Sequence, residues 1–175
     1  MFRSLGPVAA LLVSAALIGC SDSSGPKDLL HVSVQDDCDP ASFNAALGAG
    51  TCVRQGSTTF TAFNSELNAT HSVAAWKFVP ATLTIHVGQR IVAMNNGGEM
   101  HTFTEVAAFG GGIVPALNQA SGNPNEAPEC AAITASDMIA SGASFTTDAA
   151  DTPGETEHYQ CCIHPWMRAN VTTVQ

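Results

Sequence analysis

The sequence predicts an all-β sandwich with a short helical segment before it and a long inserted loop within it. Charged residues make up 12% of the 175-residue chain, a low fraction that favours a β-rich exported protein. Leu83, Ile85 and Val87 alternate with polar residues, as in a strand with one buried face. We expect the sandwich to begin at Trp76, to turn at Gly88, and to use strands at 82–87, 91–94, 144–146, 156–161 and 171–174.

Residues 29–70 form a predicted preface to a main domain at 71–175. Residues 30–34 alternate like a strand. A short helix should follow, with Asp39 as N-cap, Pro40 in the first turn and Gly48 as the stop. A second short helix is indicated by apolar residues at i, i+3 and i+7: Phe60, Phe63 and Leu67.

An acidic run precedes the first predicted helix. Asp36, Asp37 and Asp39 lie close together but lack the spacing of a calcium-binding EF-hand loop. Helix capping and solvation therefore explain the run better than a cation site does.

Residues 1–19 have the features of a bacterial lipoprotein signal peptide. Arg3 supplies a positive charge, and the apolar stretch at 7–18 has only 12 residues, too few to span a bilayer. Gly19-Cys20 resembles a lipobox, so Cys20 is the predicted lipidation site and 20–28 a flexible tether. The alternative is an ordinary cleaved signal peptide. Either interpretation predicts export, and the first predicts a membrane anchor through lipid alone, facing the periplasm or the cell exterior.

The inserted loop is expected at residues 107–142. The segment between His101 and Cys161 is longer than a minimal sandwich needs and is rich in Gly, Pro and Asn. Its Gly110-Gly111-Gly112 run lacks the Lys-Ser/Thr ending of a phosphate-binding loop. The insertion therefore receives no predicted ligand.

The overall charge limits the partners. The formal net charge is −9, which disfavours nucleic-acid binding and favours a basic protein partner.

The strongest chemical signal lies near the C-terminus. Cys161, His164 and Met167 are each separated by two residues, which places a thiolate, an imidazole and a thioether in one loop. His101, far upstream, can supply a second imidazole. Two His and one Cys with a weak axial Met describe a blue-copper electron-transfer site, so one copper ion is the predicted cofactor.

These residues resemble a cupredoxin of the plastocyanin and amicyanin type. The loop shares Tyr-x-Cys followed by His-Pro-aromatic-Met-Arg, here Tyr159, Cys161, His164, Pro165, Trp166, Met167 and Arg168. The resemblance implies a Greek-key β-sandwich with one type 1 copper ion that carries single electrons. It also implies electron exit at a surface edge of His164 beside Trp166, toward a partner such as a c-type cytochrome. Where cupredoxins commonly carry Asn after the first His and Thr or Ser after the Cys, this chain has Thr102 and Cys162.

Electron transfer has two alternatives from other function classes. A copper chaperone or storage protein is the main alternative, and a binding module that holds a partner in the inserted loop is another. Storage proteins usually multiply Met or Cys ligands, whereas this chain offers one Cys-containing site. An enzyme is not expected, because all four ligand positions are filled and none remains for substrate.

The remaining cysteines predict two disulfides. With Cys20 reserved for lipid and Cys161 for copper, four cysteines can pair in three ways. Cys38 and Cys52 flank the first predicted helix, which leaves Cys130 for Cys162. Adjacent residues on a strand point to opposite faces, so Cys162 should point away from the metal. A bond between Cys161 and Cys162 remains an alternative, although it would consume the thiolate that copper needs.

Overall fold

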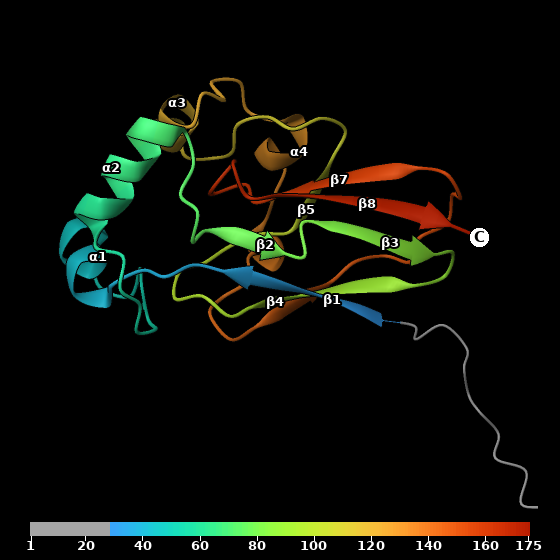
Figure 1. Cartoon of the computed structure of the whole chain (residues 1–175), viewed down its shortest axis with the longest axis horizontal. Coiled ribbons are helices and arrows are strands. Elements are labelled where there is room, and N and C mark those ends of the chain that lie inside the picture. Colours follow the sequence, from blue (N-terminus) through green and yellow to red (C-terminus); the bar gives the residue numbers. More distant parts are fainter. Residues whose placement is uncertain (1–28) are drawn as a thin grey trace, which may run out of the picture.

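The computed structural model describes residues 29–175. The predicted signal peptide, Cys20 and the tether lie outside these residues. The strands are β1 (Leu29–Gln35), β2 (Lys77–Val79), β3 (Thr82–His86), β4 (Arg90–Asn95), β5 (Thr104–Val106), β6 (Ser144–Thr146), β7 (Thr156–Gln160) and β8 (Arg168–Val174). They form two mixed four-stranded sheets, in the orders β2-β1-β4-β6 and β3-β8-β7-β5, and the sheets pack as a β-sandwich (Figure 1).

The sandwich begins earlier in the chain than the sequence predicts. β1 pairs in parallel with β4 along its length and antiparallel with β2, so it is an inner strand of the first sheet. Val32 and Val34 on β1 are fully buried. The expected start at Trp76 is therefore wrong, because hydrophobic alternation identifies a strand but not its partners.

The turn at Gly88 connects the two sheets and does not form a hairpin. Gly88 has φ +87°, which favours glycine, and it follows β3. β3 pairs with β8, whereas β4 pairs with β1 and β6. Ile85 and Ile91 are consequently buried in the same core from opposite sheets.

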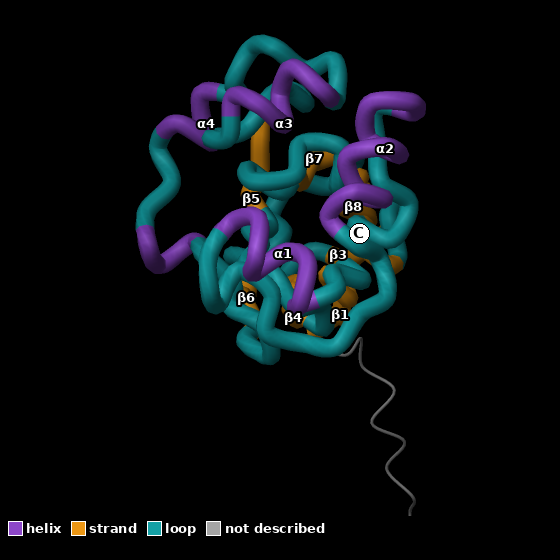
Figure 2. The backbone as a smooth tube through the Cα atoms, turned by 90° about the vertical axis from the view of Figure 1, so that its left-hand side faces the viewer, coloured by secondary structure: helices purple, strands orange, loops and turns teal. Residues whose placement is uncertain are grey.

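Both predicted helices of the preface are confirmed. Helix α1 (Pro40–Leu47) is capped by Asp39, whose carboxylate accepts hydrogen bonds from the amides of Ala41 and Ser42 in the first turn. The helix ends at Gly48. Helix α2 (Phe60–Thr70) buries Phe63 and Leu67. The two helices cover the end of the sandwich at which the loop between β7 and β8 lies (Figures 1 and 2).

Aromatic side chains attach these helices to the sandwich. The ring of Phe63 lies 4.8 Å from that of Trp76 and 5.9 Å from that of Trp166, measured between centroids. Phe43 of α1 stacks on Trp76 at 5.8 Å. Buried aromatic pairs of this kind stabilise a fold beyond the area that they bury.

The insertion contains short helices where the sequence predicts only loop. They are α3 (Pro115–Ala120), α4 (Pro128–Ala131) and the 3-10 helix η1 (Ala135–Asp137). Pro at the first helical position starts α3 and α4, because its fixed φ suits a helix and its missing N–H is not needed there. Among the described residues, no helix is long and apolar enough to cross a membrane.

The structure contains both predicted disulfides. Cys38 is bonded to Cys52, and Cys130 is bonded to Cys162. The first closes the segment around α1, and the second ties α4 to the residue after Cys161. Cys161 is the free cysteine of the described chain, and it is buried.

Candidate metal centre

Three predicted ligands converge at the helix-covered end of the sandwich. His101 lies between β4 and β5, and Cys161 and His164 lie in the loop between β7 and β8. The Cys161 sulfur is 3.7 Å from Nδ1 of His101 and 3.8 Å from Nδ1 of His164. One potential ligand atom from each residue lies within 4.8 Å of the others, a group compatible with one metal ion. All three side chains are buried.

Backbone hydrogen bonds hold the ligand loop closed. The Cys161 amide donates to the Met167 carbonyl at 3.0 Å, and the Met167 amide donates to the His164 carbonyl at 2.9 Å. Cys161 and Cys162 point in opposite directions, since one sulfur faces the two histidines and the other is bonded to Cys130. This is the alternation expected for extended backbone.

Thr102 links the two ligand segments. Its hydroxyl accepts a hydrogen bond from the Cys162 amide at 2.8 Å, and its own amide donates to the Cys161 sulfur at 3.4 Å. The substitutions at Thr102 and Cys162 relative to common cupredoxins therefore leave the two loops joined by hydrogen bonds.

The donor set fits copper. A thiolate with two imidazoles is the soft, mixed set that copper prefers. Burial alone would raise the pKa of the Cys161 thiol, but hydrogen bonds from His101 and His164 and their charges lower it well below its usual value. The thiolate is the form that binds a metal. Met167 is 1% exposed and belongs to the same buried hydrophobic cluster as Cys161. Its role as an axial ligand stays a prediction.

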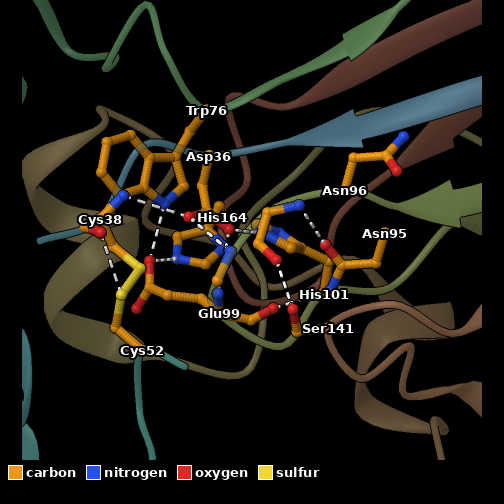
Figure 3. Close-up of polar contacts among 12 residues, drawn as sticks. Asp36, Cys38, Cys52, Trp76, Asn95, Asn96, Glu99, His101, Ser141 and His164 are labelled. Atoms are coloured by element: carbon orange, nitrogen blue, oxygen red, sulfur yellow. Dashed lines mark hydrogen bonds and ion pairs between the residues drawn. A yellow bond between two sulfur atoms is a disulfide. The ribbon is translucent and has the colours of Figure 1, made fainter. Parts of the chain in front are cut away.

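Each histidine also faces a carboxylate through its other ring nitrogen (Figure 3). Nε2 of His101 is 2.8 Å from Oδ2 of Asp36, and Nε2 of His164 is 3.5 Å from Oε2 of Glu99. Burial would raise the pKa of Asp36, but hydrogen bonds from His101, Gly98 and Glu99 lower it to about 2. Burial would lower the pKa of His164, but hydrogen bonds and charge interactions with Cys161 and Glu99 raise it to about 10.

Sequence reasoning missed these carboxylates. Asp36 belongs to the acidic run for which the sequence predicts capping and solvation, yet its side chain is fully buried. Only the parallel pairing of β1 with β4 brings Asp36 to the loop before His101, and that pairing has no local sequence signal. Glu99 has a weak signal, since it lies two residues before a ligand.

His164 has little exposed surface, and its predicted role as the electron exit stays a prediction. His164 is only 2% exposed, and Trp166 is half-buried with its ring centroid 5.5 Å from that of His164. Phe63 of α2 packs on Trp166, so the preface covers the face that the cupredoxin resemblance implies is exposed. The small exposed part of His164 lies in the wall of a surface pocket with Val53, Met100 and Ile163.

Solved structures match the fold of this chain, whereas the sequence comparisons find no match. No family model matches the chain, and no curated protein matches it. A purple cupredoxin from Nitrosopumilus maritimus is 13% identical with TM-score 0.45, covering 82% of this chain and 97% of its own. Oxidised plastocyanin from Dryopteris crassirhizoma is 17% identical with TM-score 0.42, covering 82% and 99%. A reduced amicyanin mutant is 20% identical with TM-score 0.36, covering 58% and 77%.

These identities and TM-scores are low, so the fold is assigned from the chain itself. Two mixed four-stranded sheets pack as a sandwich, and a His-Cys-His group is formed by loops at one end. This combination is a cupredoxin-like β-sandwich.

Proposed function

We propose that the protein binds one copper ion in a type 1 site and carries single electrons between redox partners. The observation that supports this most is the buried group of His101, Cys161 and His164. Bound copper would supply the one-electron Cu(II)/Cu(I) couple. The chain's role is to hold two imidazoles and a thiolate in fixed positions, through the loop hydrogen bonds of Cys161 and Met167, and to keep water away. Little rearrangement would then accompany a change of charge.

The test is the visible spectrum of the copper-loaded protein together with its electron-transfer rate. A thiolate bound to Cu(II) in such a site should give an intense blue or purple colour that disappears on reduction. Rapid, reversible oxidation by a redox protein supports the proposal. Transfer of the copper itself to an acceptor protein or chelator, with no electron exchange, would support the copper chaperone or storage alternative.

The partner we propose is a basic redox protein such as a c-type cytochrome. Six carboxylates line one surface pocket next to β5 and β7: Glu105, Asp137, Asp148, Asp151, Glu155 and Glu157. Burial and the neighbouring acidic groups, first among them Glu157, raise the pKa of Glu105, as a concentration of negative charge should. Such a surface would steer a cationic protein during encounter.

Neutralising the pocket should slow association with a basic cytochrome. We expect Asp151→Asn with Glu155→Gln to lower the second-order electron-transfer rate at low salt by about tenfold, since steering acts on association. The difference should shrink at 1 M salt, where the Debye length is about 3 Å. Stopped-flow kinetics over a range of ionic strength measures both effects.

Glu126→Gln removes one exposed carboxylate outside this pocket and serves as the control. It should change the rate much less than the double variant does. A rate for the wild-type protein that is flat or rises with salt would contradict acidic steering.

We infer further that the protein is exported and lipid-anchored at Cys20, facing the periplasm or the cell exterior. The support is the apolar run at 7–18 and the Gly19-Cys20 pair. Mass spectrometry of the mature N-terminus should find Cys20 as the first residue with acyl chains attached.

A further inference from the structure

The two ligand histidines are held by carboxylates from two different parts of the chain. Asp36 follows β1 and contacts Nε2 of His101, and Glu99 lies between β4 and β5 and faces Nε2 of His164. An ionised carboxylate can only accept a hydrogen bond. Nε2 of His101 therefore carries the proton of its 2.8 Å hydrogen bond to Asp36, and its Nδ1 is left to bind a metal beside Cys161. Nε2 of His164 makes a longer contact of 3.5 Å with Glu99, and its Nδ1 likewise faces Cys161.

Asp36 is built into the loop that carries His101. Its Oδ1 accepts from the amides of Gly98 at 2.9 Å and Cys38 at 3.2 Å. Its Oδ2 accepts from the Glu99 amide at 3.0 Å as well as from His101. Four hydrogen bonds fix both the position and the charge of this buried group.

Glycines make the approach of Asp36 possible. A Cβ on Gly97 would lie 1.9 Å from Oδ2 of Asp36, so no other residue fits there without displacing the carboxylate. A Cβ on Gly98 would meet the disulfide sulfurs of Cys38 and Cys52 at 2.6 and 3.0 Å. The preface is therefore packed directly against the loop before His101.

Glu99 is held from the other side by Trp76, which packs against the helices of the preface. The indole Nε1 of Trp76 donates to its Oε2 at 2.7 Å, and Trp76 packs between Phe43 and Phe63 of the two helices. The Glu99 side chain is 8% exposed, so water screens its charge weakly. Glu99 thus occupies the place beside His164 where the cupredoxin resemblance led us to expect solvent.

We propose that Asp36 and Glu99 are positioning residues of the metal centre, which orient His101 and His164 through Nε2 and lower the reduction potential of the bound copper. This inference rests on the proposed copper site. Two buried negative charges added to the Cys161 thiolate stabilise Cu(II) more than Cu(I), because the oxidised ion carries the larger charge. Reduction then becomes less favourable than in the same site without them.

The experiment removes each charge while keeping the side-chain shape. Asp36→Asn and Glu99→Gln are compared with Asp37→Asn in copper-loaded protein. Asp37 is the neighbouring residue, and its carboxylate accepts from Ser57 and Thr58 rather than from a ligand histidine. Protein-film or solution voltammetry gives the potential, and the visible spectrum reports whether the thiolate-copper bond remains.

We expect the ratio of Cu(II) to Cu(I) affinity to fall about tenfold in Asp36→Asn and in Glu99→Gln, the lower end of the effect of outer ligand partners. A tenfold change corresponds to a rise of about 59 mV in a one-electron potential. Asp37→Asn should stay at the wild-type potential. If both test variants keep the colour and match Asp37→Asn in potential, the inference is wrong. If Asp36→Asn does not fold, Glu99→Gln decides alone by the same criterion.

A second measurement separates this inference from the proposed function. Long-range ¹H–¹⁵N spectra of the protein without added metal should show a slowly exchanging Nε2 proton on His101. That proton should exchange rapidly in Asp36→Ala and remain slow in Asp37→Ala. A wild-type protein that binds no copper but shows this pattern would refute the copper function and keep the orienting contact. A copper protein without the slow proton would refute the contact and keep the function.

Discussion

Cys161→Ser should abolish the visible colour of the copper-loaded protein completely. The colour depends on a thiolate bound to Cu(II), and Cys161 is the free cysteine of the described chain and lies within 3.8 Å of Nδ1 of both histidines. A serine hydroxyl stays protonated at neutral pH and is a poor ligand for copper. Absorption and electron paramagnetic resonance spectra of the protein with one equivalent of Cu(II) measure the loss.

Cys162→Ser is the matched control, one residue away. It breaks the bond to Cys130 and should keep the colour, because this sulfur points away from the histidines. Its cost should fall on stability: the bond joins residues 32 apart, and a loop of that size is worth about 3 to 4 kcal/mol in the chain-entropy model. Loss of colour in Cys162→Ser with retention in Cys161→Ser would show that the ligand assignment is off by one residue.

Substitutions of the other predicted ligands should affect the colour to different degrees. His101→Ala and His164→Ala each remove one of the two imidazole donors and should largely eliminate the colour. Met167→Leu should keep a coloured thiolate-copper centre with a shifted potential, because an axial thioether tunes the site more than it holds the metal. Loss of all colour in Met167→Leu would contradict an axial role.

Local sequence signals predict the parts of this structure that depend on near neighbours. The spacing of Cys161, His164 and Met167 places three candidate ligands in one loop, and Asp39, Pro40 and Gly48 define α1 from its ends. These features depend only on residues that are close in the sequence, so they form in the same way whatever the surrounding fold is. The opposite directions of Cys161 and Cys162 follow in the same way from extended geometry.

Contacts between distant segments explain what the sequence did not predict. Asp36 looks like one member of an exposed acidic run until β1 pairs in parallel with β4 and brings it to His101. The edge of His164 is expected to be exposed, yet Phe63 of the preface packs on Trp166 of its loop and leaves His164 only 2% exposed. In both cases a segment before residue 77 changes the surroundings of a ligand without altering the ligand motif.

Gly112→Ala should disrupt the packing of the insertion against the ligand loop. A Cβ at Gly112 would lie 1.9 Å from the carbonyl oxygen of Cys162 and 2.5 Å from its carbonyl carbon, and backbone cannot move aside as a flexible side chain can. The position is held by Asn118, which exchanges two hydrogen bonds of 2.7 Å with the Gly112 backbone. Overpacking of this kind typically costs about 1 to 3 kcal/mol.

Gly112→Ala should also change the structure of the metal centre. The Ile113 amide donates to the Cys162 carbonyl at 2.7 Å. A shift of the insertion should therefore also shift the backbone of Cys162, the residue next to Cys161. We expect Gly112→Ala to lower the urea midpoint and to shift the visible absorption of the copper-loaded protein. Ile113→Ala is the control: it keeps the backbone hydrogen bond and truncates a side chain that is 38% exposed, so it should cost less than about 1 kcal/mol. Equal midpoints and identical spectra for the two variants would show that the insertion does not press on the ligand loop at Cys162.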